Sequence, residues 1–201
     1  MTARKVTGVV LAAGAATRFG SPKQLAKFGA STLIDTAIDA LDTPSVDAVG
    51  VVLGCNSELI WTHLKERKIA RPIQALHNSN WQLGLSTSIH CATKMAMEQK
   101  ASHLLLLTCD QPLVSKELIE NILKLLDRDT LVACKYGDTS GIPAVFPAAL
   151  FRELLLLKGD RGAKSIIQNN TSVILEFPDG IYDVDQQADL ERLSVPNLQS
   201  S

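Results

Sequence analysis

The chain alternates between short runs of consecutive hydrophobic residues and longer stretches in which hydrophobic residues recur every three or four positions. The short runs, such as Leu104 to Leu107, predict strands buried on both faces, because a strand with one face in water would alternate hydrophobic and polar residues. The spaced pattern, as at Leu33, Ala37 and Leu41, predicts helices that bury one face. Strands are therefore predicted at residues 6–11, 48–53, 72–76, 103–108, 130–135, 144–146 and 172–177, and helices at 31–41, 56–68, 85–99, 115–126, 148–157, from about 162, and in a closing segment that ends near 193.

Strands that alternate with helices favour a mostly parallel sheet covered by helices on both faces. We therefore predict a three-layer α/β fold, formed by a single domain over residues 1–193, with a polar tail at 194–201. In sheets of this kind ligands bind outside the carboxyl ends of the strands. The loops after Leu11, Thr108 and Phe146 are accordingly expected to share one crevice.

The loop after the first strand combines small residues with two cations. Leu11 to Gly14 leaves backbone N–H groups accessible, and Arg18 and Lys23 would add full positive charges for phosphate oxygens. The spacing fits neither the P-loop nor the dinucleotide fingerprint, since Gly14 and Gly20 are five residues apart. An ordinary connection with two surface cations is the alternative.

A carboxylate follows the most hydrophobic strand. Asp110 comes directly after the strand at 103–108, where one or two carboxylates would suffice to hold Mg²⁺ on a phosphate ligand. A second acid is available at Asp183 or Asp185, of which only one would face the crevice in an extended segment. The alternative is that Asp110 only caps the following turn, which Pro112 would stiffen.

Composition excludes several classes of partner. The 20 Lys and Arg residues nearly balance the 21 Asp and Glu residues, so neither nucleic acid nor an acidic membrane surface is an expected partner. No apolar run approaches the length of a membrane span, and the start of the chain does not resemble a cleavable signal. We expect a soluble, cytoplasmic protein.

The cysteines and histidines give no metal or nucleophile signature. The four cysteines are widely spaced, which argues against a structural zinc site and against a disulfide framework. A nucleophilic Cys109 is disfavoured because the neighbouring Asp110 would raise the pKa of its thiol. The four histidines are isolated from one another and are expected to pack or to lie at the surface.

Six segments, taken together and in order, resemble the MobA-like nucleotidyltransferases, and among them the molybdenum cofactor cytidylyltransferase (MocA-like) branch. They are Leu11 to Gly14 with Arg18, Gly20 and Lys23; Asn80 to Ser86 with Ser88; Cys109 to Pro112; Gly141 to Pro143 with Phe146; Gly159 to Ala163; and Asp183 to Asp185. The resemblance covers nearly the whole chain and implies the Rossmann-like nucleotidyltransferase fold.

The resemblance also implies roles for individual residues. Catalytic roles fall to Arg18, Lys23 and Asp110. The nucleotide is expected to contact Leu11, Ala12, Ala13, Gly14, Arg18, Lys23, Gln82, Gly84, Leu85 and Ser86, and the acceptor substrate to contact Gly141, Pro143, Gly159, Asp160 and Gly162. Mg²⁺ is expected on Asp110 and Asp185. The family usually continues with Thr-Pro after the second aspartate, where this chain has Gln186-Gln187, so Asp183 stays an alternative to Asp185.

The implied reaction is transfer of CMP from CTP to the terminal phosphate of molybdopterin, with release of pyrophosphate. In this family an Ala-Ala-Gly loop, as at Ala12 to Gly14, is associated with CTP, and an Ala-Gly-Gly loop with GTP. One alternative is another nucleotidyltransferase of this fold that makes a CDP-alcohol or an NDP-sugar. A second is a non-catalytic protein that binds or inserts the molybdenum cofactor. A molybdenum hydroxylase or its maturation factor would be the protein partner.

Overall fold

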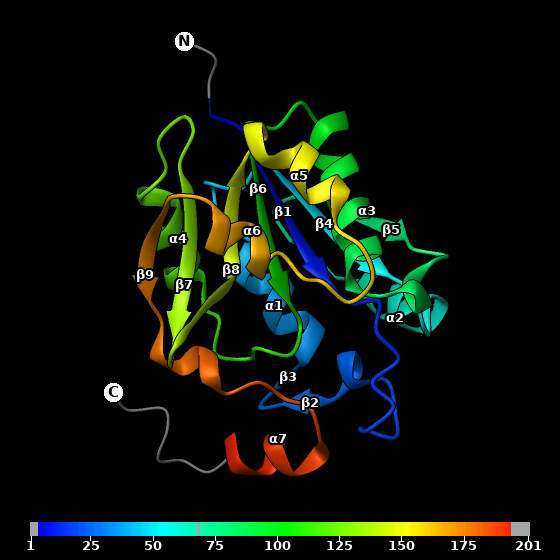
Figure 1. Cartoon of the computed structure of the whole chain (residues 1–201). Helices are drawn as coiled ribbons and strands as arrows, with labels where there is room; N and C mark the ends of the chain where they lie inside the picture. The colour runs from blue at the N-terminus through cyan, green and yellow to red at the C-terminus, as the bar shows by residue number, and fades with distance from the viewer. Residues whose placement is uncertain (1–3, 68, 194–201) are drawn as a thin grey trace.

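The computed structural model describes residues 4–67 and 69–193 (Figure 1). The tail predicted at 194–201 and the last residue of the helix predicted at 56–68 lie outside the described residues.

Seven strands form one sheet in the order β5-β4-β1-β6-β8-β7-β9. Every neighbouring pair is parallel except the two pairs that involve β8, which runs antiparallel to both β6 and β7. The strands are β1 Val6–Leu11, β4 Ala48–Leu53, β5 Ile73–His77, β6 His103–Thr108, β7 Leu131–Tyr136, β8 Thr139–Pro147 and β9 Ser172–Glu176. The prediction of a mostly parallel sheet is confirmed.

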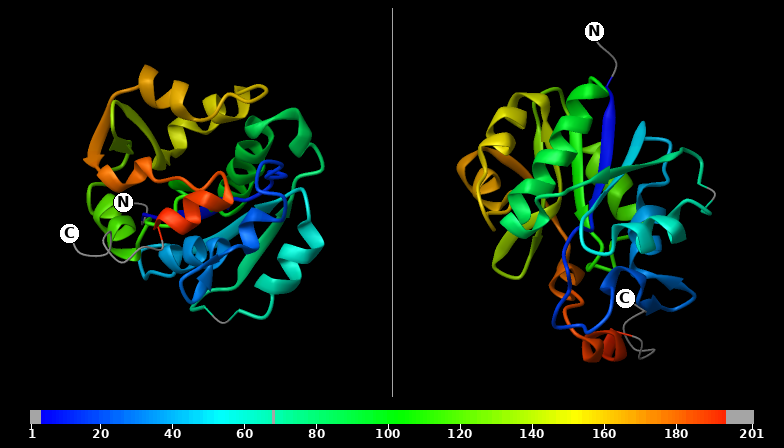
Figure 2. Two further views of the ribbon diagram at one scale, coloured as in Figure 1. Left: turned by 90° about the horizontal axis from the view of Figure 1, so that it is seen from below. Right: turned by 90° about the vertical axis from the view of Figure 1, so that its right-hand side faces the viewer.

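Helices cover both faces of this sheet, as the two further views show (Figure 2). The α-helices are α1 Leu33–Leu41, α2 Ser57–Leu64, α3 Leu85–Glu98, α4 Lys116–Lys124, α5 Phe151–Leu156, α6 Lys164–Asn169 and α7 Gln187–Leu193, and the 3₁₀ turns are η1 Lys23–Leu25, η2 Trp81–Leu83, η3 Ala148–Leu150 and η4 Pro178–Ile181. Within the described residues no helix has both the length and the apolar character that a bilayer crossing requires.

Alternate residues of the central strands supply two separate cores. Val6 and Val10 of β1 pack with α1, α2 and α4, whereas Val9 and Leu11 pack with α3, α5 and α6. Successive side chains of a strand point to opposite faces, so a strand covered on both sides must be apolar throughout. This is why the central strands are mostly hydrophobic along their whole length, and the three-layer prediction is confirmed.

The antiparallel strand corrects one expectation about the crevice. β7 and β8 are joined across Gly137 and Asp138, and so short a connection can only return the chain antiparallel. Pro147 at the end of β8 therefore pairs with His103 at the start of β6. The loop after Phe146 lies at the opposite end of the sheet from the loops after Leu11 and Thr108, and the beginning of β8 lies on their side instead.

A small layer closes the carboxyl end of the sheet. It contains the hairpin of β2 Lys27–Phe28 and β3 Ser31–Thr32, together with α7, which Figure 1 shows below β1 and β6. Its core is a separate hydrophobic cluster: Phe19, Leu33, Val184, Leu190 and Leu193. Phe19 and Val184 both belong to this cluster, and the residues next to them, Arg18 and Asp185, form an ion pair between distant parts of the chain.

Candidate active site

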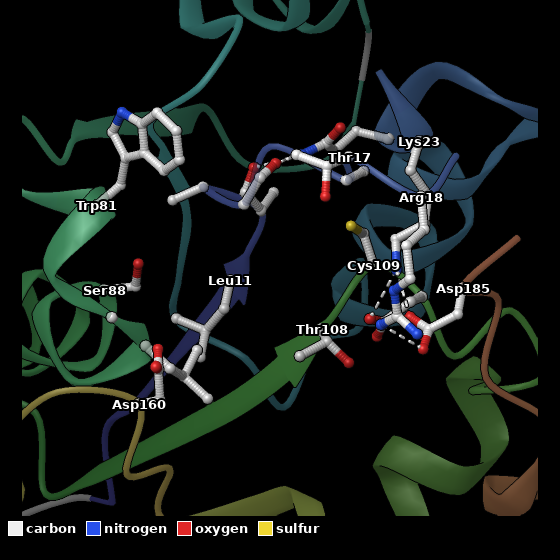
Figure 3. Close-up of a pocket in the computed structure, with 18 of the residues that line it drawn as sticks. Leu11, Thr17, Arg18, Lys23, Trp81, Ser88, Thr108, Cys109, Asp160 and Asp185 are labelled. Carbon is white, nitrogen blue, oxygen red and sulfur yellow. Dashed lines mark hydrogen bonds and ion pairs between the residues drawn. The ribbon is translucent and has the colours of Figure 1, made fainter. Parts of the chain in front are cut away.

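A cleft of about 500 Å³ opens at the carboxyl ends of β1 and β6, the two strands at the centre of the sheet. Leu11 and Thr108, the last residues of these strands, are register partners and both line it. The cleft has two chemically different ends: Figure 3 shows Trp81, Ser88 and Asp160 on one side and Arg18, Lys23 and Asp185 on the other. The expected meeting of the loops after Leu11 and Thr108 is therefore found.

The loop after β1 presents backbone donors. Ala12 still donates from its backbone N–H to Val52 O (3.0 Å), as a continuation of the strand. From Ala13 to Arg18 the N–H groups have no acceptor in the part of the chain that the structure describes. Accessible N–H groups without an internal acceptor are suited to bind the oxygens of an anion.

Two cations and two carboxylates form a network at the charged end. Lys23 Nζ lies 3.1 Å from Asp110 Oδ2 and 3.4 Å from Asp185 Oδ1. Arg18 reaches the other oxygen of Asp185 at 2.8 Å. Burial of Lys23, whose side chain is 12% exposed, would by itself lower its pKa, but the charge and hydrogen bond of Asp110, with the charge of Asp185, raise it. Lys23 is thus a permanent cation.

Asp185, and not Asp183, lines the cleft. Asp183 is exposed at its surface but partly desolvated, and this desolvation, followed by repulsion from Asp185 and Asp110, raises its pKa. Between them lies Val184, which is buried and donates its backbone N–H to Asp110 O (2.8 Å). This bond ties together the two loops that carry Asp110 and Asp185.

The carboxylates fit a divalent ion that arrives with a phosphate ligand. Asp110 and Asp185 converge on a single cationic atom, Lys23 Nζ, so both can reach one ion. The described residues contain no group of three or more His, Cys, Asp or Glu side chains that could hold a metal. Mg²⁺ usually takes one or two carboxylates and completes its octahedron with phosphate oxygens and water. The donor set suits such an ion better than one held by protein alone.

The other end of the cleft is less charged. It is lined by Trp81, Gln82, Gly84, Leu85 and Ser88. The buried Asn78 donates from Nδ2 to Ser88 Oγ (3.0 Å), which leaves the Ser88 hydroxyl hydrogen available to a ligand. Ser86, which the sequence assigns to the nucleotide, is buried outside the lining, and its backbone N–H donates to Gly159 O (3.0 Å).

A second cavity of about 200 Å³ adjoins the cleft and shares Leu11 and Leu85 with it. Of the residues expected to contact the acceptor, Gly141 and Gly162 line this cavity and Asp160 lines the main cleft. Pro143 and Gly159 line neither. Gly159 instead packs against Gly84 so closely that a Cβ on Gly84 would lie 2.3 Å from the Gly159 carbonyl carbon.

Burial and a raised pKa make Cys109 poorly suited to act as a nucleophile. Its thiol is fully buried, and burial, followed by the charge of Asp110, raises its pKa to about 12. None of the four histidines lines either cavity. Gln24, which also lines the cleft, was missed, because no periodicity or motif separates it from the other polar residues that follow Lys23.

The fold and this cleft define a nucleotidyltransferase. The chain belongs to the MobA-like NTP transferase domain family, whose model matches residues 8–173. It is 28% identical over 172 residues to the nicotine blue oxidoreductase of Paenarthrobacter nicotinovorans, with 81% of each chain covered. The solved structure of Rv0371c from Mycobacterium tuberculosis has a TM-score of 0.75 at 25% identity, covering 94% of this chain and 98% of that one. The solved structure of a nucleotidyl transferase from Methanothermobacter thermautotroptrophicus has a TM-score of 0.79 at 21% identity, and the match covers 96% of this chain and 97% of that one.

Proposed function

We propose that this nucleotidyltransferase transfers CMP from CTP to the terminal phosphate of molybdopterin and releases pyrophosphate. The observation that carries the proposal is the joining of two cavities at Leu11 and Leu85. One cavity has the donors and charges for a nucleoside triphosphate, and the other has room for an acceptor beside it. The proposal includes the residue roles expected from the sequence.

The reaction forms one phosphorus–oxygen bond and breaks another. An oxygen of the acceptor phosphate attacks the α-phosphorus of CTP, and the bond from that phosphorus to the α,β-bridging oxygen breaks, so that pyrophosphate leaves with the electron pair. The acceptor phosphate is already ionised and requires no general base. Lys23 and Arg18 would orient the triphosphate and stabilise the charge that develops on it.

Mg²⁺, held by Asp110 and Asp185, would neutralise part of the triphosphate charge when bound. The ion pairs that these carboxylates make with Lys23 and Arg18 would then be exchanged: the carboxylates turn to the metal and the cations turn to the phosphates. Arg18 is suited to this exchange because its side chain is 68% exposed and free to move.

The choice of cytosine rests on Ala13 and on the resemblance. Ala13 is buried beside the loop donors, and its methyl group occupies volume that a glycine would leave open. The other end of the cleft offers Trp81 as a flat apolar wall and the Ser88 hydroxyl as a donor for a ring acceptor. These features suit a base smaller than guanine.

The second cavity suits a flat ring with a polar edge. Its apolar walls include Leu106 and Ile142, whereas Thr139, Ser140 and Lys164 bring polar groups. The Thr139 hydroxyl is buried and has no hydrogen-bond partner among the described residues. A pterin combines an apolar ring face with an edge of donors and acceptors, and it would supply the partner that Thr139 lacks.

The alternatives differ in what they consume and release. A CDP-alcohol or NDP-sugar synthase would release pyrophosphate with a different acceptor, and a binding or insertion protein would release none. The name of the nicotine blue oxidoreductase relative adds a redox reaction as a third possibility on the same fold. In a cytoplasmic setting, a molybdenum hydroxylase or its maturation factor would receive the product.

The test is pyrophosphate release, measured with CTP, GTP and ATP against molybdopterin, a phosphorylated alcohol and a sugar phosphate. We expect the highest kcat/KM with CTP and molybdopterin, by at least tenfold over the other pairs. Higher activity with another acceptor would replace the proposed substrate. Nucleotide binding without pyrophosphate release would favour the non-catalytic alternative.

A further inference from the structure

Gln24 is a buried polar side chain directly behind the phosphate-binding lysine. It lies in η1, next to Lys23, is 2% exposed and lines the wall of the main cleft. Its Nε2 donates to Ala12 O (2.8 Å) and to Gly14 O (2.9 Å) of the loop after β1. Both acceptors are carbonyl oxygens, so the atom that faces them must be the amide nitrogen.

The opposite atom of the same amide is left without a partner. Gln24 Oε1 is buried and accepts no hydrogen bond from the described residues. A buried acceptor without a donor lowers the stability of the folded state, which a hydrophobic side chain of similar shape would avoid. Packing alone therefore does not account for a glutamine at this position.

The two bonds of Gln24 help to fix the direction of three peptide units. Gln24 binds the carbonyls of Ala12 and Gly14, and the N–H of Cys55 binds the carbonyl between them, that of Ala13 (3.0 Å). In a trans peptide the N–H points opposite to the C=O of the same unit. The N–H groups of Ala13, Gly14 and Ala15 must therefore point away from Gln24 and Cys55, and none of them has an acceptor within residues 4–67 and 69–193.

We propose that Gln24 is a positioning residue that holds these three N–H groups as donors for acceptor atoms of the bound nucleotide. The inference rests on the proposed function only in taking a nucleotide as the ligand. Lys23 and Gln24 extend from the same short turn, the first to the carboxylates and the second to the loop. The short turn η1 thus positions the Lys23 ammonium group and, through Gln24, the three N–H groups of the loop relative to each other.

Two substitutions separate hydrogen bonding from shape. Gln24→Glu keeps the shape but replaces the donor with a carboxylate that repels both carbonyls, and Gln24→Met keeps the length without either polar atom. Asn170→Asp is the matched control: Asn170 Nδ2 also donates to a carbonyl, Ile166 O (3.0 Å), but Asn170 lines neither cavity. Thermal unfolding is measured for every variant.

The experiment measures dissociation constants of the full chain for CTP, CMP and pyrophosphate by equilibrium dialysis with Mg²⁺. We expect both Gln24 variants to bind CTP at least about tenfold more weakly than the wild type, and Asn170→Asp to bind it unchanged. A matching loss for pyrophosphate assigns the donors to the phosphates, and a matching loss for CMP assigns them to the nucleoside end.

Unchanged CTP affinity in Gln24→Met, with or without a lower unfolding temperature, would overturn the positioning role. That result leaves the proposed function intact, because the wild type still binds the nucleotide. If the wild type itself binds none of the three ligands, the proposed function fails and this inference fails with it.

Discussion

At the scale of single residues, the charged end of the cleft is balanced without a ligand. Lys23 and Arg18 contribute two positive charges, and Asp110 and Asp185 contribute two negative ones, all within one network of ion pairs. The raised pKa of Lys23 keeps its charge in place through neutral pH and above, since its contribution is lost only as the pH rises through the folded-state pKa, above 10.5. In the proposed function, this network would exchange its ion pairs for contacts with a metal ion and a triphosphate.

Replacement of Lys23 by alanine tests this network. We expect Lys23→Ala to lower the rate of pyrophosphate release at least about 100-fold, because it removes a fixed charge from the developing anion. Lys23→Arg keeps the charge and should recover part of the rate. Circular dichroism should show an intact fold. Activity within a factor of three of the wild type in Lys23→Ala would contradict the assignment.

The two C-terminal acids allow a matched comparison. Asp185→Asn should raise the Mg²⁺ concentration needed for half-maximal turnover at least about tenfold, because only Asp185 shares Lys23 with Asp110. Asp183→Asn, two residues away and outside the cleft lining, should keep the metal requirement of the wild type. The opposite ranking in a Mg²⁺ titration would assign the metal to Asp183.

At the scale of elements, helix α1 is held by a buried carboxylate. Asp35 forms a capping box with Thr32. Its carboxylate also contacts His63 of α2 and forms an ion pair with Arg67, which follows α2. Burial alone would raise the pKa of Asp35, but the hydrogen bonds from Thr32 and His63 and the charge of Arg67 lower it. Its contribution to stability is therefore full above the unfolded-state pKa, near 3.8, and is lost as the pH falls through the folded-state value.

Asp35→Asn should thus lower the free energy of unfolding by roughly 2 kcal/mol at pH 7. The difference from the wild type should shrink in urea denaturation as the pH falls below 3.8. Asp39→Asn is the control, because the half-exposed Asp39 pairs with the same Arg67 outside the capping box and should change stability little. A difference that is constant with pH would show that Asp35 acts by shape alone.

The contact between Gly84 and Gly159 joins the start of α3 to the loop before α6. Gly84 has a φ of 106°, and a Cβ there would overlap the Gly159 backbone. We expect Gly84→Ala to raise the KM for both nucleotide and acceptor, because these loops line both cavities. Gly29→Ala is the control: Gly29 also has a positive φ, but nothing lies within 4 Å of its added Cβ, so stability should fall while both KM values stay unchanged. Equal KM values in all three proteins would contradict a joint role for the contact.

At the scale of the whole molecule, the sequence predicts the layers more fully than the site. The hydrophobic runs identify the central strands of the main sheet because these strands are buried on both faces, as at Val9 and Val10, whereas the edge strands β5 and β9 are only partly buried. They do not reveal the direction of β8, which depends on the turn at Gly137 and Asp138. The short pairing of β2 with β3 leaves no hydrophobic pattern at all.

The site shows the same limit. Motifs identify Lys23, Asp110 and the Asp183–Asp185 pair, but spacing cannot tell which acid meets Arg18 across 167 positions of sequence. That depends on the folding of both segments onto the cluster that contains Phe19 and Val184. The sequence motifs do not single out Gln24, because its proposed role depends on hydrogen bonds to two carbonyl oxygens that come within its reach only in the folded loop. Ser86 illustrates the reverse: it is a motif residue whose backbone N–H donates a hydrogen bond to Gly159 O, while its side chain lies outside the lining of the cleft.

The most direct test of the proposed reaction is a single-turnover experiment with CTP labelled at the α-phosphorus, excess enzyme, Mg²⁺ and molybdopterin. We expect the label to move to the acceptor in a one-to-one ratio with released pyrophosphate, with no label retained on the protein, and we expect Asp110→Asn to slow this transfer at least about 100-fold. Label that stays in CTP, or that appears on the protein as a covalent intermediate, would contradict it.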